Sequence, residues 1–385
     1  MVVQGRRGRV ASEILLLCVL TLAASVALAR VALAGTMTDL GTLGGASSAA
    51  FAIDDLGHVA GTADTPDSFH AFRWTASLGM QDLGTLGGAT SAATAMNDLG
   101  VVIGTSDTKR GATHAFRWTR SGGMRDLGTL GGGRSDAFAI NALGRVTGSA
   151  SRSGGADHAY LWTPARGMRD LGTLGGSDST GFAINDLGAV TGQAATSDGT
   201  EHAFRWTASG GMQDLGTLPG GTSSFGSAID DFGRVGGLSD VDGTFHAFRW
   251  TSSGGMEDLG TLGGDQSEVN AMSRLGPATG AATTSTGALH AFRWTPSGGM
   301  EDLGTLGGDE SFGAAISTVG AVTGNARTAT GKLHAFRWSR SHGMQDLGAL
   351  SPGGSSSGTA INDLGQVTGS SDTAAGPQHA FRWVP

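Results

Sequence analysis

Short runs in which apolar and polar side chains alternate recur along the chain, separated by clusters of Gly, Ser and Asp. The runs are rich in aromatic and β-branched residues, which favour strands, and no window keeps an apolar period of 3.6 residues for long. Each stretch of about 44 residues contains four such runs. In one representative stretch we predict strands at Thr180–Asn185, Ala189–Gly192, His202–Thr207 and Met212–Leu218.

Two motifs repeat at a nearly constant spacing. His-Ala-Phe-Arg-Trp, or a close variant, recurs every 44 residues and finally after 45, at His70, His114, His158, His202, His246, His290, His334 and His379. Asp-Leu-Gly-Thr-Leu, or a variant, recurs after 43 and then every 44 residues, at Asp39, Asp82, Asp126, Asp170, Asp214, Asp258, Asp302 and Asp346. Eight units therefore cover Met37 to Pro385, so we expect one repeat domain across residues 35–385.

Four antiparallel strands per unit, repeated eight times, predict an all-β fold, a β-propeller of eight four-stranded blades. A parallel β-helix is the competing architecture, but its coil is usually shorter and it needs distinct end caps. The repeats begin with a strand of the Asp-Leu-Gly type, Met37–Leu43, and finish with its usual hairpin neighbour, His379–Trp383. We therefore expect the N-terminal strand to pair with the C-terminal blade and close the ring, which removes exposed sheet edges.

The connections between strands also follow a pattern. Ile-Asn-Asp-Leu-Gly, as at Ile184–Gly188, predicts a hairpin whose type I turn is followed by Gly in the left-handed conformation. Ser-Gly-Gly-Met, as at Ser121–Met124, joins the Trp strand to the Asp-Leu-Gly strand. A long connection that varies between copies is expected after Val-Thr-Gly, for example at Gln193–Glu201.

Composition and charge narrow the class of protein. Gly supplies 68 of 385 residues and Pro only 8, which is typical of a folded chain with many turns rather than of collagen or a linker. The net charge is −8, and Lys109 and Lys332 are the only lysines. No basic stripe follows a phosphate backbone, so we expect no nucleic-acid partner.

Residues 1–34 have the features of a signal peptide. Three arginines within the first nine residues precede the uncharged run Ile14–Ala29, and two Ala-x-Ala sites end at Ala29 and Ala34. We expect cleavage after Ala34, with Ala29 as the alternative, and a secreted protein, extracellular or periplasmic. Twin-arginine export remains open. We expect no membrane span, because Arg30 interrupts the run before about 20 apolar residues have accumulated.

Cys18 is the only cysteine, and it lies within this leader. The bulky Leu17 before it does not suit lipoprotein processing. The processed chain would then lack thiols, which excludes disulfides, Cys zinc sites and a Cys nucleophile.

The three recurring motifs, His-Ala-Phe-Arg-Trp, Asp-Leu-Gly-Thr-Leu-Gly-Gly and Ala-Ile-Asn-Asp-x-Gly-x-Val-Thr-Gly, resemble the extracellular HAF repeat family of bacteria. The resemblance covers all of the chain after the leader and implies a secreted bacterial repeat protein. It brings no assigned activity and no catalytic residue. Two departures look minor: Tyr160-Leu161 replaces Phe-Arg, and Pro277-Ala278 replaces the usual x-Val.

Eight equivalent histidines suggest a metal site or a structural role. The His strand is third from the ring centre, which would separate neighbouring histidines by about 13 Å. Zinc holds its nitrogen ligands at about 2.1 Å, so these histidines cannot share an ion. We expect structural histidines that are hydrogen-bonded between sheets, and a separate pairing of the repeated Asp with the Arg of Phe-Arg-Trp.

Three features occur once. Gly354–Gly358 matches Gly-x-Ser-x-Gly, but a nucleophile elbow needs a strand-to-helix turn, so we expect a chance match. Asp240–Gly243 resembles a fragment of a calcium loop but lacks the later acidic ligands, which favours a solvated hairpin tip. Asp309-Glu310 is expected to be an exposed acidic pair.

These observations favour a secreted binding or structural scaffold over an enzyme. We expect no catalytic, cofactor-binding or metal-binding residues and no cofactor, and the ligand, an extracellular glycan or protein, stays unknown. The alternative is a polysaccharide-acting enzyme with its site in the central channel, which needs a unique set of carboxylates or histidines. No loop cluster in the sequence breaks the repeat symmetry in that way. We expect a monomer.

Overall fold

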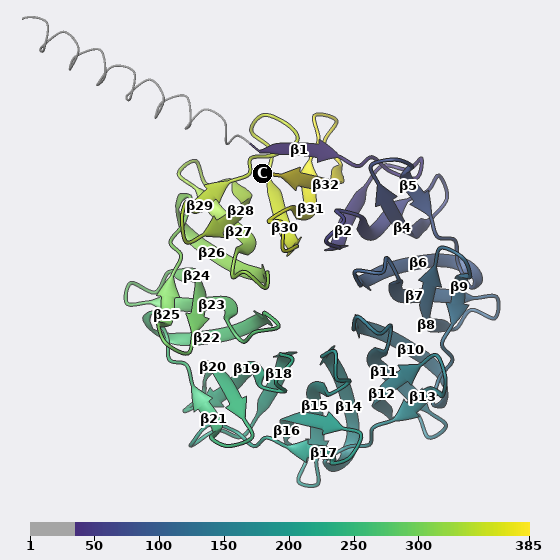
Figure 1. Cartoon of the computed structure of the whole chain (residues 1–385), viewed down its shortest axis with the longest axis vertical. Coiled ribbons are helices and arrows are strands. Elements are labelled where there is room, and N and C mark those ends of the chain that lie inside the picture. Colours follow the sequence, from purple (N-terminus) through teal and green to yellow (C-terminus); the bar gives the residue numbers. More distant parts are fainter. Residues whose placement is uncertain (1–34) are drawn as a thin grey trace, which may run out of the picture. The chain divides into compact units, whose positions relative to one another are not determined.

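The computed structural model describes residues 35–385, and all regular secondary structure in this range is β-strand. Thirty-two strands form eight four-stranded antiparallel sheets, the blades, and Met37–Trp383 forms the ring of blades (Figure 1). The predicted eight-bladed β-propeller is confirmed, and a parallel β-helix is not the architecture. The predicted signal peptide, residues 1–34, lies outside the described residues.

Each blade places its strands at four successive distances from the ring centre (Figure 1). The innermost strands are β2 (Ser48–Ile53), β6 (Gly87–Met96), β10 (Gly131–Ile140), β14 (Gly175–Ile184), β18 (Ser224–Ile229), β22 (Gly263–Met272), β26 (Gly307–Ile316) and β30 (Ser356–Ile361). The second strands are β3 (Val59–Asp64), β7 (Val102–Thr108), β11 (Val146–Arg152), β15 (Val190–Thr196), β19 (Val235–Val241), β23 (Ala278–Thr284), β27 (Val322–Thr328) and β31 (Val367–Asp372).

The third strand carries His-Ala-Phe-Arg-Trp, and the outermost strand ends at the Asp of Asp-Leu-Gly. The third strands are β4 (Phe69–Thr75), β8 (Thr113–Thr119), β12 (Asp157–Thr163), β16 (Glu201–Thr207), β20 (Thr244–Thr251), β24 (Leu289–Thr295), β28 (Leu333–Ser339) and β32 (Gln378–Val384). The outermost strands are β5 (Gly79–Asp82), β9 (Gly123–Asp126), β13 (Gly167–Asp170), β17 (Gly211–Asp214), β21 (Gly255–Asp258), β25 (Gly299–Asp302), β29 (Gly343–Asp346) and β1 (Thr36–Asp39). Blades are numbered 1 to 8 from β2–β5 to the last blade, β30–β32 with β1.

Blade 8 takes its outermost strand from the other end of the ring, as predicted. Its strand order is β1-β32-β31-β30. Beyond β1, the amide of Leu40 donates to the carbonyl of Ala380 at 2.9 Å, and the Ser48 hydroxyl accepts the amide of Ala380 at 2.8 Å. The pairing leaves the Trp383 strand without an open edge.

The strand boundaries differ from the prediction at the outer edge of each blade. In blade 4 the outermost strand ends at Asp214 rather than Leu218, and β1 likewise ends at Asp39 rather than Leu43. The Asp214 carboxylate accepts the amide of Gly216 at 2.8 Å, and Gly216 has a φ of 69°. This local turn bends the chain out of the ladder.

The inner strands of blade 4 are longer than predicted. The innermost strand begins at Gly175, and the second continues to Thr196. The predicted long connection Gln193–Glu201 is therefore wrong in its first part, because Gln193 and Ala194 still pair with the innermost strand. The hairpin that remains is short.

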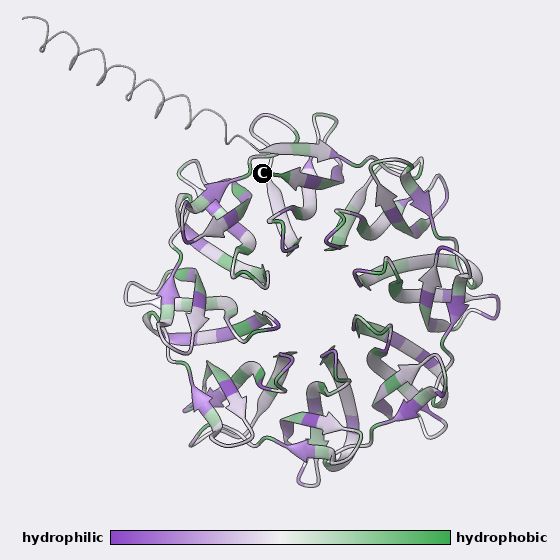
Figure 2. Cartoon of the chain, in the orientation of Figure 1, coloured by the Kyte–Doolittle hydropathy of each residue, from purple (hydrophilic) through white to green (hydrophobic). Residues whose placement is uncertain are grey.

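The apolar core lies between neighbouring blades rather than at the ring centre, and apolar segments recur in every blade (Figure 2). One cluster joins Leu161 of blade 3 to Phe204 and Trp206 of blade 4. Alternation along a strand sends successive side chains to opposite faces, so both faces of a blade are packed. Each fully buried Phe contributes about 1.5–3 kcal/mol.

Close packing between strands explains the glycine of Val-Thr-Gly. A Cβ at Gly192 would collide with the backbone carbonyl of Thr180 on the innermost strand. The equivalent glycines of other blades meet the same obstacle, for example Gly104 against Ala92. A side chain at this position would push the two inner strands apart.

Candidate functional site

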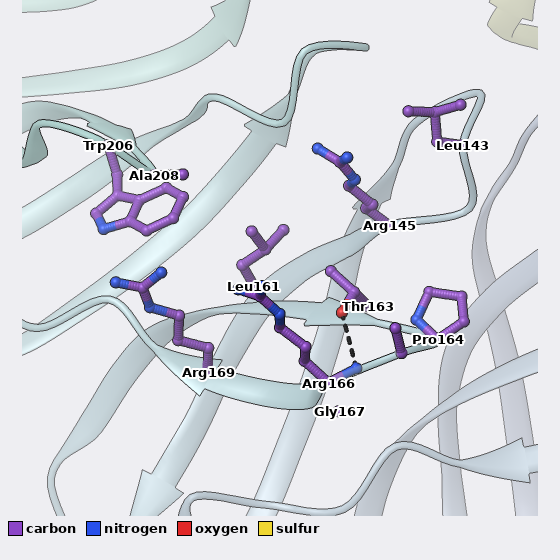
Figure 3. A pocket seen from close by; sticks show the side chains of 11 residues that line it. Leu143, Arg145, Leu161, Thr163, Pro164, Arg166, Gly167, Arg169, Trp206 and Ala208 are labelled. Carbon is purple, nitrogen blue, oxygen red and sulfur yellow. Dashed lines mark hydrogen bonds between the residues drawn. The ribbon is translucent and has the colours of Figure 1, made fainter.

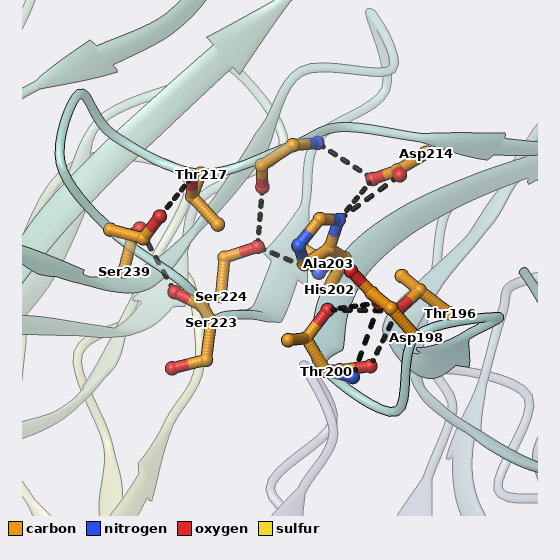
Figure 4. A network of polar contacts seen from close by, with 12 residues as sticks. Thr196, Asp198, Thr200, His202, Ala203, Asp214, Thr217, Ser223, Ser224 and Ser239 are labelled. Carbon is orange, nitrogen blue, oxygen red and sulfur yellow. Dashed lines mark hydrogen bonds and ion pairs between the residues drawn. The ribbon is translucent and has the colours of Figure 1, made fainter. Parts of the chain in front are cut away.

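Each histidine of the His-Ala-Phe-Arg-Trp motif pairs with an Asp-Leu-Gly aspartate on the neighbouring outermost strand (Figure 4). His202 Nδ1 lies 3.0 Å from both carboxylate oxygens of Asp214. The strand register explains the pair: Asp214 stands opposite Phe204, so it shares a face with His202 two residues away. The same pair occurs in the other blades at His70, His114, His158, His246, His290, His334 and His379.

Two predictions about these residues are wrong. The aspartate does not pair with the Arg of Phe-Arg-Trp, because Arg205 lies on the opposite face of the strand from His202. The histidine pairs within its own blade, not between sheets, although Nε2 of His158 and of His334 also lies 3.2 Å from a carbonyl of the next blade. Along residues 35–385, no three His, Asp, Glu or Cys side chains are grouped to hold a metal ion.

The arginines of Phe-Arg-Trp connect neighbouring blades. Arg205 Cζ lies 5.9 Å from the ring centre of Trp250 in blade 5, and Arg249 lies 5.4 Å from Trp294 in blade 6. Such cation–π contacts contribute about 0.5–2 kcal/mol each. Burial lowers the pKa of Arg337, yet a guanidinium keeps its charge at neutral pH.

A repeated serine was missed by the sequence analysis. Ser224 is fully buried; its hydroxyl accepts the Ala203 amide at 2.8 Å and donates to the Gly216 carbonyl at 2.5 Å (Figure 4). The signal was present, because a serine stands at this place in every unit. The eight are Ser48, Ser91, Ser135, Ser179, Ser224, Ser267, Ser311 and Ser356.

The Gly-x-Ser-x-Gly match at Gly354–Gly358 belongs to this serine series. Ser356 is buried, accepts the Ala335 amide at 2.8 Å and donates to the Gly348 carbonyl at 2.5 Å. It opens strand β30 rather than a helix. The match is a structural serine, not a nucleophile.

The other two single-copy features are also local. Asp242 and Gly243 form the two-residue tip of the β19–β20 hairpin with φ values of 49° and 88°. The Asp240 carboxylate accepts hydrogen bonds from the amides of Thr222 and Ser223 at 2.7 and 2.6 Å. This confirms a hairpin tip. In the exposed acidic pair Asp309-Glu310, the Glu310 carboxylate accepts a hydrogen bond from Arg327 Nε at 2.8 Å.

The turn Ile-Asn-Asp-Leu-Gly joins the blades as well as the strands. Asn185 accepts the amide of Ala189 at 2.9 Å and donates from Nδ2 to the Asp230 carbonyl of blade 5, also at 2.9 Å. Asp186 accepts the amide of Ala142 in blade 3 at 2.9 Å. Gly188 ends the turn with the predicted positive φ, 84°.

The Leu of this turn has no such role, although an apolar residue occupies its place in every blade. The turns from first to second strand and from third to fourth strand share one face, which we call the turn face. All eight apolar side chains at this place are 58–77% exposed: Leu56, Leu99, Leu143, Leu187, Phe232, Leu275, Val319 and Leu364. The turn face therefore presents one exposed apolar side chain in every blade.

Arg274 breaks the symmetry of the turns, contrary to the expectation of unbroken symmetry. It stands where five other turns carry Asp, and it reaches across to Asp186 Oδ2 at 3.1 Å and Asp98 Oδ2 at 3.5 Å, in blades 4 and 2. Burial and the nearby Asp55 raise the pKa of Asp98. A polar cavity of about 280 Å³ adjoins Arg274 among the turns of blades 1, 2, 6, 7 and 8.

A larger cavity, about 580 Å³, lies on the turn face between blades 3 and 4 (Figure 3). We call it the arginine pocket. Its lining combines apolar, aromatic and cationic groups and contains no carboxylate: Leu143, Arg145, Leu161, Thr163, Pro164, Ala165, Arg166, Gly167, Arg169, Trp206 and Ala208. The departure at Leu161, which looked minor in the sequence, lines this pocket.

No helix within residues 35–385 is long and apolar enough to cross a membrane.

Neither a protein-family model nor a curated protein matches the sequence. Among solved structures, the chain is similar to a puromycin hydrolase, with a TM-score of 0.49 at 14% identity over 85% of this chain and 58% of that chain. It is similar to a Mycobacterium tuberculosis puromycin-hydrolysing peptidase, with a TM-score of 0.50 at 10% identity over 88% of this chain and 60% of that chain.

The β-propeller domain of the Trilobed protease from Pyrococcus furiosus gives a TM-score of 0.48 at 8% identity, over 79% of this chain and 95% of that domain. The chain thus spans about three fifths of the two peptidase structures and nearly the whole of the isolated propeller domain. At these identities the similarity shows the fold alone.

Proposed function

We propose that this protein is a secreted binding scaffold of the HAF repeat family that holds an extracellular glycan on its turn face. The observation that carries the proposal is the set of eight exposed apolar side chains on that face. The Asn, Asp and Gly of the same turn are used by the fold, whereas the apolar residue between Asp and Gly is not. Its presence in every blade therefore favours a role in binding.

A glycan suits the chemistry of this face. Sugar rings present apolar C–H faces and hydroxyl edges, and the turn face places aliphatic side chains beside guanidinium, hydroxyl and carboxylate groups. The arginine pocket shows this mixture on a small scale, with Leu161 and Trp206 beside Thr163 and Arg169. Repetition around the ring would let a polysaccharide contact several blades at once, which raises its overall affinity.

The arrangement favours binding without catalysis. Glycoside hydrolysis uses two carboxylates placed around the scissile bond, one of them protonated. The aspartates of the turns instead accept backbone amides of neighbouring blades, as Asp363 does from Thr318 at 2.7 Å, and two of them pair with Arg274. These carboxylates hold the turns together.

The test is binding of the purified protein to an array of neutral and acidic glycans, with matched variants on two faces. Leu187→Ser with Leu275→Ser alters the turn face, and Phe69→Ser with Phe245→Ser alters exposed residues near the hairpin turns of the opposite face. We expect the first pair to weaken glycan binding at least tenfold, or by about 1.4 kcal/mol, and the second to leave it unchanged.

Three outcomes would overturn the proposal. One is that the purified protein binds no glycan on the array but does bind another exported protein. Another is loss of binding in the Phe variants only. The third is release of reducing ends from a bound polysaccharide, which would establish an enzyme.

A further inference from the structure

We infer that the arginine pocket between blades 3 and 4 is a subsite for an acidic sugar, a hexuronate residue that presents a carboxylate and an apolar ring face. The inference rests on the proposed function, because it names the class of glycan that the turn face takes. It comes from the one blade in which the repeated Arg of Phe-Arg-Trp is absent.

The missing arginine normally makes two contacts. In blade 2, Arg117 lies 5.9 Å from the ring centre of Trp162 in the next blade, and it also packs against the turn glycine of that blade, Gly144. In blade 3 its place is taken by Leu161, a buried side chain that belongs to the same apolar cluster as Trp206 but has no guanidinium to stack on that ring or to reach the turn glycine.

Two other arginines replace these contacts. Arg169 on β13 stacks on Trp206 with its Cζ 4.9 Å from the ring centre (Figure 3). Arg145 reaches the turn of blade 4, donates to the Leu187 carbonyl at 3.2 Å and packs against Gly188. Because these arginines arrive from different elements, the volume above Leu161 stays open.

The resulting pocket suits one carboxylated ring. Its volume of about 580 Å³ is within the usual range of small-ligand sites, roughly 300–1,000 Å³. Leu161 and Pro164 provide apolar surface for a ring face. Arg166 and Arg169 form no ion pair with any residue in the range 35–385, so their guanidinium forks can take a carboxylate.

The positive charge of this pocket distinguishes it from the same place in blades 5 and 6. At the position of Arg169, blades 5 and 6 carry Glu257 and Glu301, which lie 3.6 and 3.8 Å from the Arg of their own blade. The positive charge of those arginines is already balanced by a nearby glutamate. In a chain with a net charge of −8, a pocket with three arginines and no carboxylate selects an anion.

The test is calorimetric titration of the purified protein with trigalacturonate, its neutral counterpart galactotriose, and inorganic phosphate. Leu161→Arg restores the residue of the other blades and fills the pocket, and blade 2 shows that such an Arg can share a Trp with a second arginine, Arg125. Arg169→Gln removes a cation. Arg125→Gln is the matched control, at the same strand position in blade 2.

We expect trigalacturonate to bind at least tenfold more tightly than galactotriose and to weaken as salt is added. Leu161→Arg and Arg169→Gln should each lose at least tenfold in affinity, while Leu161→Arg keeps the melting temperature and Arg125→Gln keeps the affinity. Unchanged trigalacturonate binding in Arg169→Gln would overturn the inference, as would equal binding of galactotriose or tight binding of phosphate alone. If galactotriose binds and is lost with the Leu187 and Leu275 variants, the proposed function stands and this inference fails.

Discussion

At the scale of single residues, most of the repeated polar side chains satisfy the backbone. The buried serine of each innermost strand bonds two backbone groups of the neighbouring blade, as Ser224 bonds the Ala203 amide and the Gly216 carbonyl. The histidine–aspartate pair is different, since the His202 side chain is 20% exposed and that of Asp214 45%. A substitution of the serine should therefore reduce stability more than a substitution of the histidine.

Ser224→Ala should lower the free energy of unfolding by about 2–4 kcal/mol, because the Ala203 amide and the Gly216 carbonyl both lose a buried partner. Urea denaturation measures the change. Ser209→Ala, in an exposed turn, is the control and should stay within about 0.5 kcal/mol of the parent. Equal midpoints for the two variants would show that the hydroxyl of Ser224 is dispensable.

Trp206→Ala should lower stability by about 3–5 kcal/mol, since it removes a large buried side chain between blades 3 and 4. His202→Ala should lower it by only about 1 kcal/mol, because its partner Asp214 remains half-exposed and keeps its bond to Gly216. The same changes at Trp294 and His290 should rank in the same order by thermal denaturation. A His variant as unstable as the Trp variant would contradict the pairing described.

At the scale of an element, the Ile-Asn-Asp-Leu-Gly turn separates folding from binding within five residues. The Asn is buried and joins two blades, and the Leu two positions later is the most exposed of its set, at 77% in blade 4. A substitution in this turn should thus affect either stability or ligand affinity, depending on the position.

Asn185→Ala should destabilise the protein by about 2–3 kcal/mol, since the Asp230 carbonyl and the Ala189 amide lose their side-chain partner. Leu187→Ala should change stability by less than about 0.5 kcal/mol. Both are measured by chemical denaturation, and glycan affinity is measured on the same samples. A strongly destabilised Leu187 variant would mean that the exposed leucine serves the fold after all.

At the scale of the whole molecule, two of the contacts between distant parts of the sequence differ in kind. One is the strand β1, which completes blade 8. The other is Arg274, which links blade 6 to blades 2 and 4 at the turn face. The first is a ladder of backbone bonds in which Met37 is partly buried against the core. The second is a set of partly exposed ion pairs, so the two energies should differ.

Deletion of residues 35–39 should lower the free energy of unfolding by several kcal/mol, about 3–5, because the ladder to β32 and the His379–Asp39 pair are lost. The open β32 edge should also promote aggregation, which light scattering detects. A protein that begins at residue 35 is the control. If both proteins melt at the same temperature, strand closure contributes nothing to stability.

Arg274→Ala should lower the melting temperature at pH 7 and have less effect at pH 4. The pKa of Asp98 is raised by burial and by Asp55, and Arg274 opposes this rise. A carboxyl whose pKa is higher in the folded state favours folding when protonated, and its charged form weakens folding as pH rises through that pKa. Without Arg274 this penalty at pH 7 grows, by about 1 kcal/mol or less for half-exposed pairs. Arg340→Ala, on an exposed turn, is the control, and an effect of Arg274→Ala that is the same at both pH values would contradict this account.

The sequence by itself determined the architecture, because the repeat spacing and the strand alternation are local properties that recur in every unit. The eight blades, the closure by the N-terminal strand and the turn glycines all followed from Met37–Leu43, His379–Trp383 and motifs such as Ile184–Gly188. The strand ends were less accurate, since Asp214 leaves the ladder through a bond to a backbone amide that a propensity pattern does not contain.

Only the tertiary structure decided which repeated groups meet. Aspartate and arginine occupy adjacent strands, and the pairing of Asp214 with His202 rather than Arg205 depends on register and strand face. The turn leucines could be seen as repeated but not as exposed. The pocket at Leu161 and the bridge at Arg274 arise where one unit has a residue that no other unit has at that position. Their geometry depends on neighbours that lie 42 to 176 residues away in the chain. Contacts between blades determine these sites, and a sequence pattern within one blade does not specify them.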